Sequence, residues 1–289
     1  MRLDDINESD QVEDRRGGGG MRMGGGGSLG IGTVVILGVI GWALGINPAV
    51  LIGGAEMVQG MRNGGQQVST GPSGPVSDNT GKFVARVLGS TETVWSQVLP
   101  QQANVRYTKP QLVLFSGATR SSCGAAQAAM GPFYCPLDRK VYLDTAFFQE
   151  MQKRLGGGGD FAYAYVIAHE VGHHVQNLLG ILPKVQEAQQ RLPRREANAL
   201  SVRVELMADC LAGVWANHSK DQIHLDQNDI REAMTTASAI GDDALQKQAQ
   251  GYAVPDSFTH GSSAQRQQWF TTGFQSGNVK TCNTFQSRQ

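Results

Sequence analysis

A metal-binding pattern of histidine and glutamate lies in the middle of the chain. Residues 169–173 read His-Glu-Val-Gly-His, an H-E-x-x-H pattern inside a largely apolar stretch that is predicted to be helical. Residues four apart lie on one face of a helix, so His169 and His173 can direct their imidazole rings at one cation. Glu170 would then reach a water molecule on that cation. Because two histidines leave such a site incomplete, a third ligand must come from elsewhere.

A second predicted helix, residues 196–217, offers that ligand. Glu205 and Asp209 lie four residues apart among apolar neighbours. Buried carboxylates are costly unless they are paired or bound to metal, so Glu205 is predicted to be the third ligand. Asp209, one turn further on, is predicted to accept a hydrogen bond from the non-ligating nitrogen of a metal-bound histidine. The alternative is a pair of exposed or salt-bridged acids, with His218 as a weak rival ligand.

His174 directly follows the second histidine of the pattern. A helix turns by about 100° per residue, so this ring points away from that of His173. It is therefore predicted not to bind the metal.

Several stretches of the chain resemble a known family. They are MRLDDINESDQVEDRR, the single long apolar segment, GPFYCPLDRKVYLD, AHEVGHHVQ, ELMADCLAGVWA and FTHGSSAQRQQWF. The chain resembles the gluzincin-type H-E-x-x-H peptidases and, more closely, the YpfJ-like family of bacterial neutral zinc metallopeptidases. This resemblance implies that His169, His173 and Glu205 bind Zn²⁺ and that Glu170 is the catalytic base.

The resemblance also implies a role for a histidine near the C-terminus. In some gluzincin-like peptidases with membrane segments, a Thr-His dipeptide before the last helix places a histidine at the oxyanion, and an arginine nearby helps to hold the site. His260 and Arg266 occupy the matching positions here. Gly261 replaces the proline that usually follows, so a loop or capping histidine is the alternative.

The expected fold is α+β and mainly helical, a zincin-like metallopeptidase domain with a small sheet. Residues 111–115 and 140–143 are short apolar runs that predict strands. By resemblance, the segment GPFYCPLDRKVYLD supplies an edge strand that would bind an extended peptide through its main chain. An ordinary sheet strand is the alternative.

The N-terminal quarter predicts a membrane anchor. Residues 1–29 are expected to form a flexible cytoplasmic tail, 30–53 a transmembrane helix, 54–79 a Gly/Ser/Pro linker and 80–289 the metallopeptidase domain. Ile31–Gly53 carries no charge over 23 residues, enough to cross a bilayer. Arg15, Arg16 and Arg22 precede it, which favours a single-pass protein of the bacterial inner membrane with its catalytic domain on the periplasmic or outer side. A cleaved signal peptide is the alternative.

The composition limits the partners. The chain has 25 basic and 25 acidic residues and no nucleic-acid motif, so no nucleic-acid partner is expected. Its four cysteines form no C-x-x-C pair and allow three disulfide pairings. Cys123–Cys135 and Cys210–Cys282 is the preferred pairing for an exported domain. Four buried thiols would be preferred if the orientation were reversed.

These observations predict a membrane-anchored, zinc-dependent endopeptidase that acts on a protein or peptide substrate. The alternative is a non-catalytic envelope protein with a structural or degenerate zinc site that binds a partner peptide. A third possibility is a latent protease that a partner must open. The fourth coordination position of the metal distinguishes the enzyme from the non-catalytic protein. An open position beside Glu170 favours hydrolysis, and a fourth protein ligand such as His218 or His260 favours a structural site.

Overall fold

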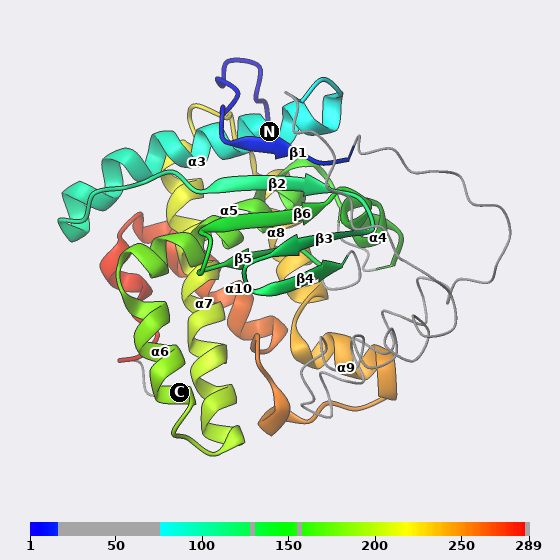
Figure 1. The fold of residues 1–289 in the computed structure, drawn as a ribbon, viewed down its shortest axis with the longest axis vertical. Coiled ribbons are helices and arrows are strands. Elements are labelled where there is room, and N and C mark those ends of the chain that lie inside the picture. The colour runs from blue at the N-terminus through cyan, green and yellow to red at the C-terminus, as the bar shows by residue number, and fades with distance from the viewer. Residues whose placement is uncertain (17–75, 128–130, 155–157, 287–289) are drawn as a thin grey trace, which may run out of the picture.

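The protein is mainly helical and carries a small sheet, as expected for the α+β class. The computed structural model describes residues 1–16, 76–127, 131–154 and 158–286. Figure 1 shows the sheet in the upper part of the molecule, with α6, α7 and α9 reaching below it. The helices are α3 (Asn79–Ala103), α4 (Ala146–Arg154), α5 (Asp160–Leu178), α6 (Ile181–Gln189), α7 (Arg194–Ser219), α8 (Gln227–Ala239), α9 (Asp242–Gln250) and α10 (Ser263–Ser276). The strands are β1 (Val12–Asp14), β2 (Gln111–Phe115), β3 (Ala118–Ser121), β4 (Gly124–Gln127), β5 (Phe133–Cys135) and β6 (Lys140–Asp144).

The main sheet has four strands in the order β1-β2-β6-β5, and β3 and β4 form a separate hairpin. β2 pairs in parallel with β1 and with β6, whereas β5 pairs antiparallel with β6. The central strands β2 and β6 are buried at four of their five positions, which explains why both read as continuous apolar runs. Both predicted strands are confirmed. β5 lies at an edge of this sheet, so the segment GPFYCPLDRKVYLD does supply an edge strand.

The helix α7 runs through the core and packs against both α5 and α10. Small residues allow this close approach. A Cβ on Gly172 of α5 would lie 3.0 Å from the carbonyl oxygen of Ala208 on α7. A Cβ on Gly273 of α10 would overlap the carbonyl group of Cys210. The backbones of these three helices are therefore held in fixed register, and α5 and α7 carry the residues of the metal-binding pattern.

Residues 1–16 do not form a flexible tail, so this prediction was wrong for the first half of the expected tail. Leu3 and Ile6 are buried in the same core as α3 and α5. Val12–Asp14 form β1, which extends the sheet beside β2. Polar side chains and a following run of glycines suggested a solvated arm, but strand pairing with β2 and backbone hydrogen bonds to Ala85 and Ile223 hold this segment on the domain.

The predicted membrane helix, residues 30–53, lies outside the residues that the structure describes, as does most of the predicted linker 54–79. None of the helices in the described part of the chain is long and apolar enough to span a bilayer. The described chain resumes at residue 76, and Asp78 caps α3 by accepting a hydrogen bond from the backbone N–H of Gly81.

The two preferred disulfides are both present. Cys123–Cys135 joins the β3–β4 hairpin to the edge strand β5. Cys210–Cys282 joins the C-terminal segment to α7. No cysteine of the chain is free.

Candidate metal centre

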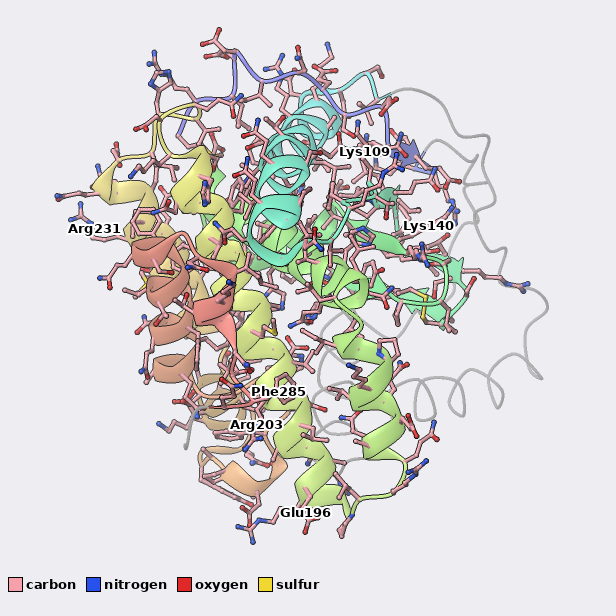
Figure 2. The ribbon with its side chains drawn as sticks, turned by 90° about the vertical axis from the view of Figure 1, so that its left-hand side faces the viewer. Lys109, Lys140, Glu196, Arg203, Arg231 and Phe285 are labelled. Atoms are coloured by element: carbon pink, nitrogen blue, oxygen red, sulfur yellow. A yellow bond between two sulfur atoms is a disulfide. The ribbon has the colours of Figure 1, made fainter. Side chains whose placement is uncertain are left out.

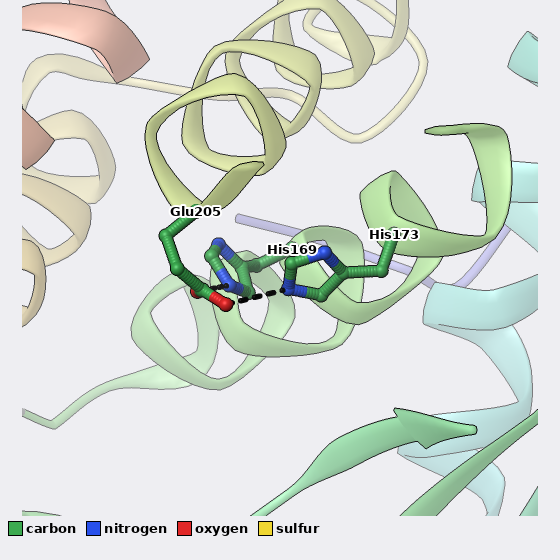
Figure 3. A group of neighbouring side chains, drawn as sticks. All are labelled: His169, His173 and Glu205. Atoms are coloured by element: carbon green, nitrogen blue, oxygen red, sulfur yellow. Dashed lines mark hydrogen bonds and ion pairs between the residues drawn. The ribbon is translucent and has the colours of Figure 1, made fainter. Parts of the chain in front are cut away.

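Two histidines of α5 and one glutamate of α7 converge on a single point. The ligand atoms of His169, His173 and Glu205 all lie within 4.8 Å of one another. The Nε2 atoms of the two imidazoles lie 3.1 and 3.5 Å from the two carboxylate oxygens of Glu205. Figure 3 shows the carboxylate facing both rings. Two atoms bound to one tetrahedral zinc ion at about 2.0–2.1 Å are about 3.3 Å apart, so this donor set has the spacing that zinc requires.

The remaining nitrogens of both rings are held by hydrogen bonds. Nδ1 of His169 lies 2.8 Å from Oδ1 of Asp209. Nδ1 of His173 lies 2.9 Å from the amide oxygen of Gln176, whose own nitrogen donates to the carbonyl of Val204 at 2.6 Å. Both partners accept hydrogen bonds, which places a proton on each Nδ1 and makes Nε2 the atom of each ring that would bind a cation.

Asp209 is the centre of a buried polar cluster. It is fully buried and accepts hydrogen bonds from the Tyr165 hydroxyl at 2.6 Å and from two nitrogens of Arg266 at 2.8 and 2.9 Å. Burial alone would raise the pKa of Asp209, but Arg266 and His169 lower it to about 2. Asp209 is therefore ionised, and its charge is balanced by Arg266 rather than by a bound metal. Asp209 lies against Nδ1 of His169, the position that the sequence predicted for it.

The carboxylates of Asp209 and Glu205 change the pKa of His169. Burial alone would lower the pKa of His169, but Asp209 and Glu205 raise it to about 10. Protons and a cation therefore compete for the Nε2 atom of His169, and a bound cation must displace a proton.

Glu170 lies on α5 between the two histidines and is 7% exposed. Burial raises the pKa of its carboxyl group, and His169 and His173 oppose that rise. A carboxylate whose pKa is raised in this way is suited to take up a proton, which is the role that the sequence predicted for Glu170.

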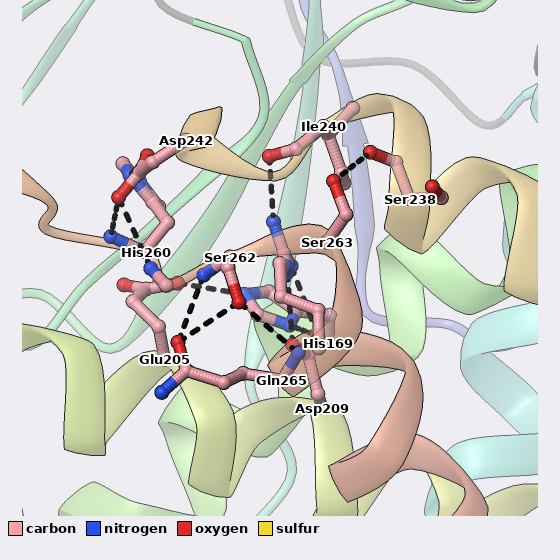
Figure 4. Close-up of polar contacts among 12 residues, drawn as sticks. His169, Glu205, Asp209, Ser238, Ile240, Asp242, His260, Ser262, Ser263 and Gln265 are labelled. Atoms are coloured by element: carbon pink, nitrogen blue, oxygen red, sulfur yellow. Dashed lines mark hydrogen bonds and ion pairs between the residues drawn. The ribbon is translucent and has the colours of Figure 1, made fainter. Parts of the chain in front are cut away.

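His260 lies on the loop before α10, and Asp242 holds that loop. One oxygen of this fully buried carboxylate accepts from three successive backbone N–H groups, those of residues 259–261, at 2.7, 2.7 and 3.0 Å. The other oxygen lies 3.4 Å from Nδ1 of His260. Figure 4 shows His260 beside Asp242 and on the same side of the cluster as Glu205. The side chain of His260 is 43% exposed, so it borders solvent while its backbone is fixed.

The other histidines take no part in the cluster. The Nε2 atom of His218 bonds to the carbonyl of Gly277 at 2.8 Å. His174 is fully buried and faces away from the cluster, as predicted: its two nitrogens lie 3.0 Å from the Tyr134 hydroxyl and 2.6 Å from the Thr108 carbonyl. Burial lowers the pKa of His174 to about 4, so the ring is neutral.

The contacts of His174 hold the edge strand β5 against α5, the helix that carries the H-E-x-x-H pattern. The Tyr134 hydroxyl of β5 bonds both to His174 and, at 3.0 Å, to the amide nitrogen of Asn177 on α5. β5 is thus fixed against α5 one turn beyond His173.

Three residues of the site were missed in the sequence. Gln176 could have been found, because it lies three residues after His173 on the same helix face. Tyr165 also lies on α5, four residues before His169, but an aromatic residue in an apolar helix reads as core. Asp242 gave no signal, since only the fold brings it to residues 259–261.

The architecture and the site together define a metalloprotein whose centre consists of an H-E-x-x-H helix and a glutamate from a second, closely packed helix. The chain belongs to the family described as "Putative neutral zinc metallopeptidase", whose model matches residues 1–285. The match includes residues 1–16, in agreement with their place in the fold. Zinc is the cofactor that this family implies, and the His-His-Glu cluster fits it.

Relatives of the chain occur in Escherichia coli and Mycobacterium tuberculosis. An uncharacterized protein of Escherichia coli, YpfJ, is 47% identical over 292 aligned positions that cover 99% of each chain. An uncharacterized protein of Mycobacterium tuberculosis, Rv2575, is 45% identical over 207 positions, which cover 68% of this chain and 67% of the relative. No solved structure matches the chain.

Proposed function

We propose that this chain is a zinc-dependent endopeptidase in which His169, His173 and Glu205 hold the ion. One observation carries the proposal. Among the described residues, the cluster contains three side-chain ligands and no fourth, and His218 bonds elsewhere. A site with three protein ligands keeps a position open for water or substrate, whereas structural zinc sites fill all four positions.

The proposed chemistry is general-base hydrolysis of a peptide bond. Bound zinc would polarise the scissile carbonyl and lower the pKa of a water molecule toward about 7. Glu170 takes the proton of that water and delivers it to the leaving amine. Its burial at 7% exposure raises the pKa of the carboxyl group, which makes the protonated form accessible during turnover.

His260 is proposed to donate a hydrogen bond to the carbonyl oxygen of the substrate as negative charge develops there. The position of His260 in the structure supports this role. Asp242 fixes the backbone of the loop through three hydrogen bonds, and its other oxygen lies 3.4 Å from Nδ1 of His260. Removing one such donor costs about 3 kcal/mol of transition-state stabilisation in other enzymes.

The substrate is proposed to bind along β5. This strand lies at an edge of the four-stranded sheet, and its Tyr134 is tied to α5 through His174 and Asn177. An unpaired strand edge offers main-chain donors and acceptors to an extended peptide of any sequence. A peptide added there would run past the metal-bearing helix.

The proposed location is the outer side of the bacterial inner membrane. Both disulfides of the chain favour an oxidising compartment. The uncharged stretch Ile31–Gly53 favours attachment to the membrane.

The test is Glu170→Gln in the full-length protein, assayed for zinc content and for cleavage of a peptide library. We expect the variant to bind one equivalent of zinc and to lose cleavage by a factor of about 10² or more. Arg195→Gln, a change at an exposed surface position, is the matched control and should leave both unchanged. Cleavage by Glu170→Gln at the wild-type rate would exclude this mechanism. A wild-type protein that binds zinc tightly but cleaves no peptide would favour the non-catalytic alternative.

A further inference from the structure

The N-terminal segment, residues 1–16, is built into the domain that carries the metal site. The backbone N–H of Ser9 donates to the carbonyl of Ala85 on α3 at 3.0 Å. The N–H of Leu112 on β2 donates to the carbonyl of Gln11 at 2.9 Å. Together with the burial of Leu3 and Ile6, these bonds make the segment an integral part of the core rather than an attachment to its surface.

Ion pairs along the segment add to these contacts. Lys109, which precedes β2, pairs with Asp10 at 3.6 Å, and Lys140 on β6 pairs with Glu13 at 3.1 Å. Figure 2 shows both lysines beside the N-terminal strand.

The chain leaves the domain and returns to it at the same place. Arg16, the last described residue before the apolar stretch, donates hydrogen bonds to both carboxylate oxygens of Asp78 at 2.7 and 2.9 Å. Asp78 is also the N-cap of α3. The same guanidinium bonds to Asp14 at 2.6 Å. The two flanks of residues 17–75 are therefore in direct contact.

This contact removes the basis for the orientation predicted from the sequence. Arg15 and Arg16 counted there as cytoplasmic charges in front of the membrane segment. In the structure Arg15 pairs with Glu13 at 2.8 Å and bonds to Thr119, while Arg16 pairs with Asp14 and Asp78. Both guanidinium groups are neutralised by carboxylates of the folded domain, so they are structural residues.

We propose that residues 1–16 lie on the same side of the membrane as the metal site, so that the chain between Arg16 and Asp78 returns to the membrane face that it left. A single crossing by Ile31–Gly53 would put β1 and β2 on opposite sides of a bilayer about 30 Å thick. These strands are paired through three successive residues, so a single crossing and this sheet exclude each other. The sequence predicted a single-pass topology with a cytoplasmic tail and an outer catalytic domain. In the topology proposed here, residues 1–16 and the catalytic domain lie on the same side of the membrane.

The first test uses the full-length protein in membrane vesicles of known orientation. Asp5→Cys in the N-terminal segment and Gln222→Cys in the α7–α8 turn each introduce one thiol at an exposed position. The native cysteines are all in disulfides and provide an unlabelled background. With a membrane-impermeant maleimide, both variants should label in the same vesicle orientation. Labelling of the two variants in opposite orientations would overturn the proposal.

A second test measures proximity in the membrane and does not depend on vesicle orientation. Asp10→Cys with Lys109→Cys places two thiols at an exposed ion pair that links the N-terminal segment to the domain. Arg195→Cys with Asp256→Cys is the matched control, an exposed pair at 3.2 Å within the domain. A short bifunctional thiol reagent should cross-link both pairs to similar yield within one chain. Cross-linking of the control pair alone would show that residue 10 and residue 109 are apart, and the proposal would fail.

Discussion

Replacement of Asp209 by asparagine separates the two tasks of the buried polar cluster. The carboxylate orients His169 for the metal and neutralises Arg266, which is 3% exposed. Asp209→Asn removes the charge and turns an NH₂ group toward the guanidinium. Breaking a buried ion pair from one side costs about 3–5 kcal/mol of folding stability. The amide oxygen of asparagine can still accept a hydrogen bond from Nδ1 of His169, whereas a leucine at this position cannot. Loss of the hydrogen-bond partner of a metal-bound histidine weakens metal binding by a factor of about 10–100.

A double variant tells the two effects apart. Asp209→Leu with Arg266→Leu removes both charges, so no unpaired ion stays in the core, and we expect at least about 2 kcal/mol of the lost stability to return. Zinc affinity should fall by a factor of about 10–100 in this double variant, because Nδ1 of His169 has lost its acceptor. Arg266→Leu alone should destabilise the protein, because it leaves Asp209 buried as an unpaired anion.

The assays are urea unfolding of the metal-free proteins and competition for zinc against a chromophoric chelator. Arg195→Leu, at an exposed position, is the control for loss of an arginine. Zinc affinity of the leucine double variant within a factor of two of wild type would refute the role of Asp209 in orienting His169. A double variant less stable than Asp209→Asn would refute the assignment of the stability loss to the unpaired charge.

Three further predictions concern the fold. His174 has a folded pKa of about 4 against about 6.5 in the unfolded chain, so the unfolded state binds more protons between these values and stability falls as the pH drops. Between pH 7.5 and pH 5, the free energy of unfolding of the metal-free wild type, measured in urea, should fall by about 2 kcal/mol more than that of His174→Gln. Equal decreases in the two proteins would show that His174 is not held neutral. Gly273→Ala should cost about 1–3 kcal/mol, since the added methyl group would overlap the backbone at Cys210, whereas the exposed Gln275→Ala on the same helix should be neutral. Leu3→Ala with Ile6→Ala should cost about 4 kcal/mol in the same assay and Asp5→Ala almost nothing; a neutral double variant would contradict the packing of the N-terminal segment.

The metal centre could be predicted because its chemistry is local. The spacing of His169 and His173 is set by one helix turn, and a carboxylate such as Glu205 in an apolar helix calls for a partner. The sequence left three disulfide pairings open, and the preferred one is the pairing that the structure contains. Asp242 could not be predicted, because its three backbone partners come from a loop that only the packing of α9 against α10 brings near.

The N-terminal segment was mispredicted because its interactions are non-local. β1 has three residues, two of them acidic, and shows no alternation that would indicate a strand. Its stability comes from backbone pairing with β2 and from ion pairs of Glu13 and Asp14. A charged sequence followed by glycines is typical of a solvated tail, so composition favoured the wrong structure.

The central claim, that two imidazoles and one carboxylate bind a single zinc ion and leave one position open, is tested most directly by anomalous X-ray scattering at the zinc edge from crystals of the zinc-loaded protein. We expect one anomalous peak at about 2.0–2.2 Å from Nε2 of His169, Nε2 of His173 and a carboxylate oxygen of Glu205, with only water or substrate in the fourth position. A peak bound by a fourth protein side chain, or one from which Glu205 is absent, would contradict it.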